Sequence, residues 1–149
     1  MPSHGSPSAD AARTVRAIQP AGWPRPRGYS NGVFVPAGHH MVFTAGMVGW
    51  DVHERIVPGG FVPQFEQALA NIVAVVREAG GGPEHIVRMV AFVVDKREYL
   101  DAQESLGAAW RRVIGRHFPA MALVQVAGLV EADARVEIEA IAAIPAKQA

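Results

Sequence analysis

Hydrophobic residues recur along this chain with two spacings, one typical of helices and one typical of strands. In residues 64–81 the apolar side chains follow the i, i+3, i+4, i+7 spacing of an amphipathic helix, and a run of glycines closes the segment. Residues 98–118 return to the same spacing despite Gly107 within it. The pattern therefore predicts two helices in these segments.

The strand-like runs are short, rich in branched residues and separated by turn signals. In the third of them, Val90 and Phe92 lie on one face while Met89 and Ala91 lie on the other, so both faces need cover. A turn-like break at residues 36–39 predicts that the first two runs pair antiparallel. The five predicted strands are residues 29–35, 40–48, 85–95, 121–130 and 135–144.

The order of these elements is strand, strand, helix, strand, helix, strand, strand, which predicts an α+β fold with two helices on one face of one sheet. A chain of 149 residues is the size of a single domain, which we expect over residues 28–149. Residues 1–27 are rich in Ser, Ala, Pro and Arg and predict a flexible arm or a strap over the domain. The second face of the sheet still needs a partner, so we expect other copies of the chain to cover it in a homo-oligomer.

Charge and composition narrow the classes of function. Acidic and basic residues balance at 14 each, and the arginines are scattered along the chain, which argues against a nucleic-acid-binding surface. The chain has no cysteine, and its six histidines lack the spacing of a helical metal site, so we expect no metal. We also expect no cofactor, because no phosphate-binding or dinucleotide-binding glycine motif is present. No apolar leader or membrane-length span occurs, and we expect a cytoplasmic protein that acts on a small molecule.

The last predicted strand carries the carboxylates of greatest chemical interest. Glu137 and Glu139 are two residues apart and so share one face of the strand, opposite Val136 and Ile138. If the apolar residues face the helices, both glutamates face the surface assigned to subunit contact. A carboxylate in such a cleft can hold or activate water. A solvated or arginine-paired strand face is the alternative that the pattern leaves open.

Several motifs occur in an order and spacing that resembles the Rid family, the reactive intermediate deaminases that are also called YjgF or L-PSP endoribonucleases. The most specific are "FPA" and "VEIEAIA", and the others are "GYSNGV", "VFTAGMVGWD", "QALANIVAVVREAGG" and "HIVRMVAFVVD". The similarity covers about residues 28–144. It implies a chorismate-mutase-like fold of the YjgF type and a homotrimer with small-molecule clefts between subunits.

The resemblance also implies roles for single residues. In active deaminases of the family, an arginine directly after "FPA" clamps the carboxylate of a 2-imino or 2-enamino acid, and a glutamate of the "EIE" strand holds the attacking water. The glutamate corresponds to Glu137, and a cleft tyrosine corresponds to Tyr29. The other implied substrate-binding residues are Ala45 and Gly46, in the pocket turn that begins at Thr44, and Gln103, in place of a helix asparagine.

Met121 stands where the family's arginine would be, and this departure argues against a 2-imino acid hydrolase. Losing a charge-assisted pair costs about 1.5 to 3 kcal/mol of binding. The stretch around Met121 also resembles the branch of the family that lacks this arginine and includes 2-aminomuconate deaminase. Met121 and Leu123 share a face of their strand and are candidates for substrate contact, although such side chains more often only pack.

Three functions follow as hypotheses. The leading one is a deaminase that acts on a 2-aminomuconate-like enamine or imine by water attack, with Glu137 as the catalytic residue. The first alternative is a ligand-binding trimer that has lost the carboxylate clamp and catalyses nothing. The second is an endoribonuclease, which the balanced charge disfavours because RNA cleavage first requires neutralising phosphates.

Overall fold

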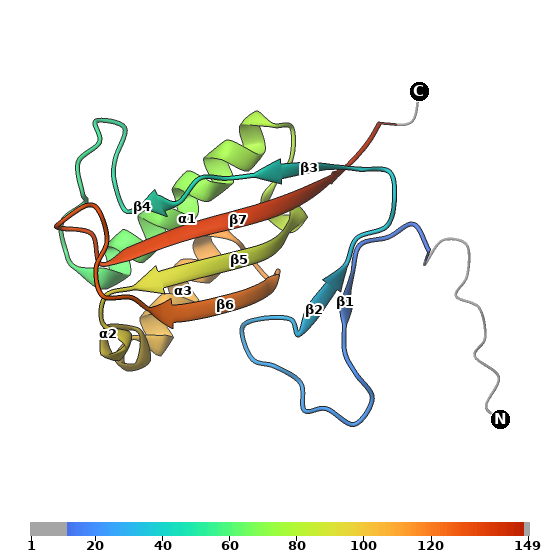
Figure 1. The fold of residues 1–149 in the computed structure, drawn as a ribbon, viewed down its shortest axis with the longest axis horizontal. Helices are drawn as coiled ribbons and strands as arrows, with labels where there is room; N and C mark the ends of the chain where they lie inside the picture. Colours follow the sequence, from blue (N-terminus) through green and yellow to red (C-terminus); the bar gives the residue numbers. More distant parts are fainter. Residues whose placement is uncertain (1–11, 148–149) are drawn as a thin grey trace.

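The computed structural model describes residues 12–147, in which helices pack behind one face of a mixed sheet (Figure 1). The expected α+β class is therefore confirmed. No helix in the described part of the chain is long and apolar enough to span a membrane. In chain order the elements are β1 (Arg16–Ile18), β2 (Gly32–Phe34), β3 (His39–Phe43), β4 (Met47–Val48), α1 (Phe61–Glu78), the 3-10 helix η1 (Pro83–His85), β5 (Ile86–Val93), α2 (Lys96–Asp101), α3 (Gln103–Val113), β6 (Ala120–Gln125) and β7 (Val136–Pro145).

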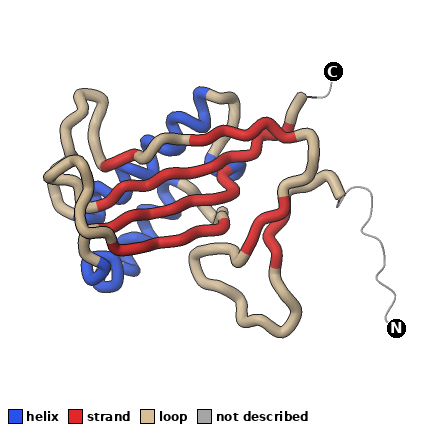
Figure 2. Tube along the Cα trace, viewed as in Figure 1, coloured by secondary structure: helices blue, strands red, loops and turns tan. Residues whose placement is uncertain are grey.

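The main sheet has five strands, and β7 lies inside it. The strand order is β3-β7-β5-β6, and the short β4 also pairs with β7. β7 runs antiparallel to β3, β4 and β5, whereas β5 and β6 run parallel to each other. A parallel pair needs a long crossover, which α2 and α3 supply on the helix side of the sheet (Figure 2). β6 is therefore an edge strand, while β7 is paired along both sides.

The core lies between α1 and the sheet, and it decides which way β7 faces. Leu69 and Ile72 of α1 are fully buried, as the helical spacing predicted, and so are Val136 and Ile138 of β7. All four belong to one hydrophobic cluster with Met89 of β5. Burying a side chain of this size contributes about 1.5 to 3 kcal/mol. The alternating residues of β7, which include both glutamates, must then face away from the helices.

The expected single helix over residues 98–118 is wrong, because the chain forms two helices there, α2 and α3. The described residues therefore contain three α-helices rather than two. At Ala102 the backbone leaves the helical region, with φ −111° and ψ 22°. The side-chain amide of Gln103 donates a hydrogen bond to the Tyr99 carbonyl at 2.6 Å and so caps the end of α2. Periodicity misses this break because the apolar spacing continues across it.

The antiparallel pairing expected between residues 29–35 and 40–48 is also wrong. β2 pairs with β1, and β3 pairs with the last half of β7. Val42 of β3 lies opposite Ala142 and packs against the core, a burial that a local hairpin with residues 29–35 would not provide. Gly38, at φ 87°, allows the turn that carries the chain from the small sheet to the large one.

The expected arm, residues 1–27, is described from residue 12 onward. Within it, Arg16 of β1 lies opposite Phe34 of β2, and its guanidinium carbon is 4.9 Å from the centre of that ring. The side-chain amide of Asn31 donates to Gln19 Oε1 at 3.0 Å. β1 thus pairs with β2 in a small sheet of their own, and residues 12–31 are called the strap below. A domain boundary at residue 28 stays a prediction.

The sheet face that the helices leave uncovered carries several exposed apolar side chains. Phe43 is 70% exposed, and Met41 and Val124 are each 45% exposed. Phe43 lies opposite Ile141 of β7, so these side chains share the face that carries the two glutamates. Large exposed apolar surfaces on soluble domains mark contact sites. The face therefore suits the expected contact with other copies, and the homotrimer stays a prediction.

Candidate functional site

Glu137 lies on the uncovered face of β7, as the alternation of this strand predicted. It is opposite Phe92 of β5 in the strand register, and it forms no ion pair with any residue between 12 and 147. Glu139 points to the same face and is exposed. It lines a hollow of about 160 Å³ together with Arg88 and Phe43. Glu137 is therefore a half-buried carboxylate that is free to contact a ligand.

The pocket turn at residues 44–46 lies directly against Glu137. A Cβ atom on Gly46 would collide with the carboxylate, because it would lie 2.9 Å from Glu137 Cδ. Thr44 fixes the turn on β7: its N–H donates to the Ala140 carbonyl at 3.0 Å, and its Oγ1 accepts from the Ala140 N–H at 3.0 Å. The structure thus places Gly46 against Glu137, with Ala45 next to it in the turn, and their role in substrate binding stays a prediction.

Helix α1 holds the following residues in place from the other side. The side-chain amide of Asn71 donates to the carbonyls of Val48 and Trp50, both at 3.0 Å. Gly49 lies so close to α1 that a Cβ atom there would be 2.6 Å from Gln64 Cα. Residues 44–50 are therefore fixed between α1 and β7, and the surroundings of Glu137 rest on rigid elements.

Met121 and Leu123 lie on the opposite face of the sheet from Glu137. Met121 of β6 is opposite Met89 of β5, whose side chain is in the core on the helix side. Leu123 packs against the same core, which agrees with the packing role that the sequence left open. Gln103 and Met121 line one cavity of about 540 Å³ between α3, β6 and residues 27–28. Within one chain, the structure does not bring this cavity together with Glu137.

The cavity beside Met121 has aromatic side chains and arginines in its wall. The rings of Trp110 and Phe118 are stacked with centroids 6.3 Å apart, and Trp110 Nε1 donates to the His117 carbonyl at 3.0 Å. Phe65 and Tyr99 complete the aromatic part of the lining. The arginines are Arg27, Arg111 and Arg116. Sequence reasoning missed these three, because Arg27 is far along the chain from Arg111 and Arg116 and meets them only in the fold.

Tyr29 lies beside the "FPA" segment, although it does not line the cavity. Its neighbour Ser30 is fixed there, because the Ser30 N–H donates to the Pro119 carbonyl at 2.9 Å and the Ser30 hydroxyl donates to the Phe118 carbonyl at 2.6 Å. Tyr29 itself is 43% exposed and precedes β2 rather than belonging to it. The strap therefore brings Tyr29 near Met121 and leaves its ring available for contact.

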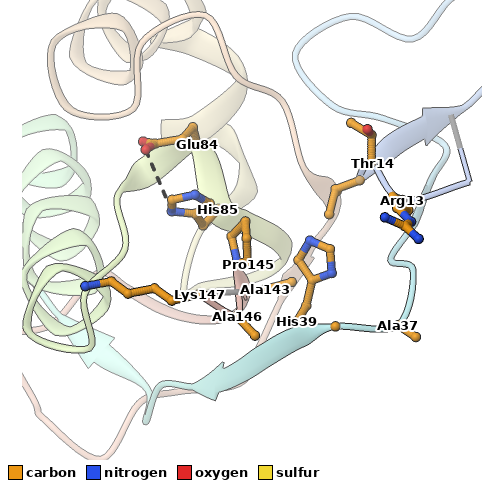
Figure 3. A pocket seen from close by; sticks show the side chains of 12 residues that line it. Arg13, Thr14, Ala37, His39, Glu84, His85, Ala143, Pro145, Ala146 and Lys147 are labelled. Atoms are coloured by element: carbon orange, nitrogen blue, oxygen red, sulfur yellow. Dashed lines mark ion pairs between the residues drawn. The ribbon is translucent and has the colours of Figure 1, made fainter. Parts of the chain in front are cut away.

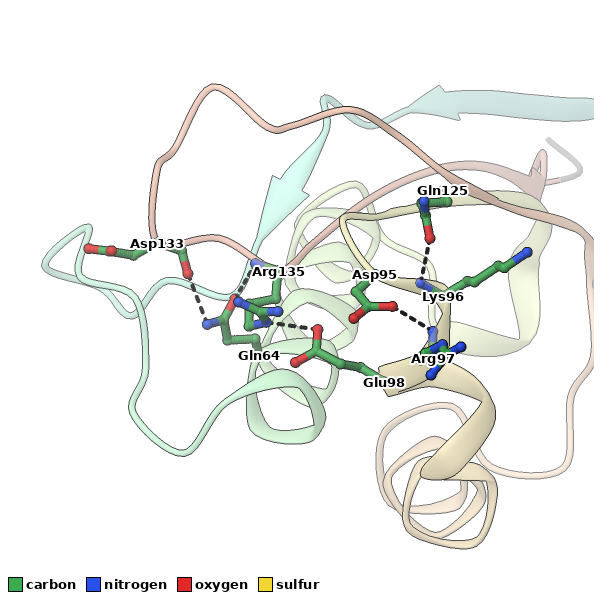
Figure 4. Close-up of polar contacts among 8 residues, drawn as sticks. All are labelled: Gln64, Asp95, Lys96, Arg97, Glu98, Gln125, Asp133 and Arg135. Carbon is green, nitrogen blue, oxygen red and sulfur yellow. Dashed lines mark hydrogen bonds and ion pairs between the residues drawn. The ribbon is translucent and has the colours of Figure 1, made fainter.

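Two other basic side chains, those of His117 and Arg135, are already engaged. His117 Nε2 donates to the Ile86 carbonyl at 2.6 Å, so the ring ties the end of the helical layer to β5. Arg135 Nε lies 2.7 Å from Glu98 Oε2, and this hydrogen bond raises the pKa of the Arg135 guanidinium above its usual range. Figure 4 shows this pair beside Gln64, whose side chain joins α1 to the start of β7. Neither side chain replaces an arginine at position 121.

Arg112 is also paired, although its neighbour Arg111 is not. Arg112 Nε and Nη2 donate to the two oxygens of Glu66, each at 2.8 Å. These hydrogen bonds lower the pKa of the Glu66 carboxyl below its ordinary value. The pair joins α1 to α3. Among the described residues, Glu66 is the one acidic residue that forms an ion pair with the last turn of α3.

A second large cavity, of about 630 Å³, lies beside the start of β3 and the end of β7 (Figure 3). It is lined in part by His39, Glu84 and His85. His85 Nδ1 accepts from the Gly82 N–H at 3.0 Å, and His39 Nδ1 lies 2.9 Å from the Pro36 carbonyl. Within the described residues no group of His, Asp and Glu is arranged to hold a metal ion. This cavity contains none of the predicted site residues, so we do not take it as the functional site.

Comparison with known families gives a match over most of the chain. The family described as Endoribonuclease L-PSP matches residues 24–144. The match begins a few residues before Gly28, where the resemblance was expected to begin. It includes both the Glu137 face and the segment around Met121.

Individual relatives agree with this match. The chain is 35% identical to the RutC family protein UK114 of Drosophila melanogaster over 102 residues, which cover 68% of this chain and 70% of that protein. It is 33% identical over 115 residues to the 2-iminobutanoate/2-iminopropanoate deaminase of Capra hircus, with coverage of 76% and 78%. The crystal structure of the Rid-family protein YyfB from Yersinia pestis superposes with a TM-score of 0.72 at 29% identity, covering 87% of this chain and 98% of that one.

Proposed function

This chain belongs to the Rid family, also called YjgF or RutC, and from that premise we propose that it is a deaminase that acts on an enamine or imine in a cleft between subunits. Several relatives are named imine deaminases, which supports this class of reaction at the level of the family. The proposed substrate resembles 2-aminomuconate, an unsaturated dicarboxylate that carries an amine. Glu137 is the proposed catalytic residue.

The observation that carries the proposal is the position of Glu137. Its carboxylate lies against Gly46, without an ion-pair partner among residues 12–147, on a sheet face with exposed apolar side chains. A second copy of the chain on this face would remove the carboxylate from bulk water, where an acid or base group acts more effectively. The two groups of candidate residues lie on opposite faces, so a cleft between copies is the arrangement that unites them.

In the proposed cleft, one subunit supplies the acid and base chemistry and the next supplies recognition. The first contributes Glu137 with the backbone of Ala45 and Gly46. The second contributes Gln103 and Met121 from the wall of its cavity, with Tyr29 beside them. No metal or cofactor takes part in this proposal.

The chemistry requires a proton to move before water attacks. A protonated Glu137 would donate its proton to the enamine carbon, which converts the C=C–NH₂ group into an iminium ion. The carboxylate would then take a proton from a bound water as its oxygen attacks the iminium carbon. Transfer of a proton to the nitrogen and cleavage of the C–N bond release ammonia and leave a keto acid. Glu137 supplies the proton that goes to the nitrogen and takes up the hydroxyl proton as the C–N bond breaks, so it alternates between its acid and base forms and ends the cycle protonated, as it began.

Ammonia release from 2-aminomuconate tests the proposal. We expect Glu137→Gln to lower kcat about 10²- to 10⁴-fold, because the variant keeps the shape of the side chain and loses the proton transfer. The control is Glu139→Gln, which changes the neighbouring exposed carboxylate on the same face and should leave the rate near that of the wild type. Equal rates for Glu137→Gln and the wild type would rule out the catalytic role.

A trimer that binds a ligand without catalysis is the second candidate. Met121 favours it, because this apolar side chain replaces the charged clamp of the active relatives. Binding of the substrate without ammonia release from the wild type would support this candidate. An endoribonuclease is not proposed, because the balanced charge provides no extended cationic surface for RNA.

A further inference from the structure

We infer that Arg27, Arg111 and Arg116 bind the carboxylates of the substrate and so take over the role of the arginine that Met121 replaces. The inference rests on the proposed function and names its substrate class, a planar unsaturated dicarboxylate. All three arginines line the cavity of about 540 Å³ that also contains Met121. A cavity of this size accommodates a small organic acid.

The charge of this cavity is positive and uncompensated. Among the described residues that line it, three are arginines and none is acidic. None of the three forms an ion pair within residues 12–147. Arg112, the neighbour of Arg111, shows the contrast, because both of its hydrogen bonds go to Glu66. The cavity arginines therefore keep their donors for an anion, and guanidinium groups bind carboxylates in a planar, bidentate way.

The rest of the lining suits a flat, unsaturated carbon chain. Phe65, Leu106 and Trp110 are almost completely buried and present apolar surface to the cavity. Met121 adds a flexible, polarisable side chain that makes favourable contacts with π systems. A saturated polar ligand would make few favourable contacts with this apolar surface. The combination of apolar wall and cationic rim distinguishes a conjugated dicarboxylate from a small amino acid.

Two segments of the chain, one with Arg27 and one with Arg111 and Arg116, hold the arginines in place. Arg111 is in the last turn of α3, and Gly115, at φ 84°, ends the helix and turns the chain before Arg116. Arg27 belongs to the strap, which Ser30 fastens to the carbonyls of Phe118 and Pro119. The backbone around all three is therefore fixed, so little order has to be gained when a dicarboxylate binds.

The test measures binding separately from turnover, by titration calorimetry of the full chain with unreactive probes. The probes are muconate with two carboxylates, sorbate with one carboxylate on a similar diene, and dimethyl muconate with none. We expect muconate to bind more tightly than sorbate by about tenfold or more, and dimethyl muconate to bind more weakly still. Equal affinity for the three probes would overturn the inference.

Variants of the arginines then assign the site. Arg111→Gln and Arg116→Gln should each raise the Kd for muconate by about ten- to a hundredfold. Arg27→Gln should also raise this Kd. Arg77→Gln is the matched control, because Arg77 is an exposed arginine in the last turn of α1 and lies outside the cavity. Unchanged muconate binding in the Arg111 and Arg116 variants would overturn the assignment.

The measurements distinguish a failure of the proposed function from a failure of this inference. If muconate binding depends on the arginines and the wild type releases no ammonia from 2-aminomuconate, the site stands and the catalytic proposal fails. If ammonia is released and the arginine variants keep the wild-type KM, the catalytic proposal stands and this inference fails. Thermal melts of each variant exclude unfolding as the cause, because these exposed side chains have no ion-pair partner in the described fold.

Discussion

Met121 is half-buried at the start of β6, on the rim of a cavity that also holds three arginines. Its side chain continues the apolar wall, so the position contributes contact area rather than charge. The resemblance to the family implies an arginine at this position that clamps the carboxylate of a 2-imino or 2-enamino acid. In this chain the three arginines line the rim of the cavity instead. This arrangement leaves more room between the charged groups that a ligand can contact.

Met121→Arg should therefore shift the preference of the protein toward short substrates. A guanidinium at the head of β6 restores a charge-assisted pair, and we expect hydrolysis of 2-iminopropanoate to rise about tenfold or more over the wild type. The measurement is kcat/KM by ammonia release. Met121→Gln, which has similar length and no charge, is the control and should show no such gain. A Met121→Arg enzyme as inactive as the control would mean that the pocket differs from its relatives in more than this residue.

Single residues could be predicted from the sequence where a local rule decides them. The shared face of Glu137 and Glu139 follows from the period of two in a strand, and the structure confirms it. The side on which Met121 and Leu123 lie could not be predicted in this way, because it depends on how β6 pairs with β5 across the crossover. The arginine cluster brings Arg27 to the distant segment that carries Arg111 and Arg116, and no spacing along the chain predicts that contact.

At the scale of elements, the close approach of Gly49 to α1 positions the site. The segment after β4 passes over the first turns of α1, and the missing side chain of Gly49 is what permits it. Asn71 of α1 donates hydrogen bonds to the carbonyls on both sides of this glycine. The turn at residues 44–46 and the face of Glu137 depend on this contact for their alignment.

Gly49→Ala should destabilise the protein by about 1 to 3 kcal/mol, the range for overpacked sites. The added Cβ would lie 2.6 Å from Gln64 Cα, which belongs to the helix backbone and has little room to move. The measurement is the free energy of unfolding from urea denaturation. Gly128→Ala is the control, because nothing lies within 4 Å of the Cβ that would be added there. Equal stability of the two variants would show that the segment around Gly49 moves away from α1 without a loss of stability.

Elements could be predicted where their signal is long and local. The first helix was expected over residues 64–81 and is found at Phe61–Glu78. The second expected helix is interrupted at Ala102, where a side-chain hydrogen bond from Gln103 rather than apolar spacing decides the end of α2. The pairing of β3 with β7 joins residues about a hundred positions apart, and long-range burial rather than the nearby turn selects it.

At the scale of the whole molecule, the uncovered sheet face decides whether the chain works alone. Phe43 is 70% exposed there, although it is aromatic and lies in a strand. Covering a side chain of this size stabilises an assembly by about 1.5 to 3 kcal/mol for each copy. The proposed trimer would cover the face and complete the cleft in the same step.

Phe43→Ser should therefore weaken the assembly, raising its dissociation constant about ten- to a hundredfold for each subunit interface from which the aromatic ring is removed. Sedimentation velocity over a range of concentrations measures the change. Leu100→Ser is the control, because Leu100 is also exposed, at 58%, but lies on α2 in the helix layer. A wild type that sediments as a monomer at micromolar concentration would contradict the trimer itself.

The division of the candidate residues between the two faces of one sheet also bears on how such a protein changes over time. Glu137 lies on the doubly paired β7, where a substitution disturbs neighbours on both sides. Met121 lies on the edge strand β6, and the arginines lie on a strap, a helix end and a loop. If Met121 and the arginines bind the substrate as proposed, mutations in this second group would alter which molecule is accepted without touching the packing around the carboxylate. A lineage with this architecture can therefore acquire new substrates while its reaction stays the same.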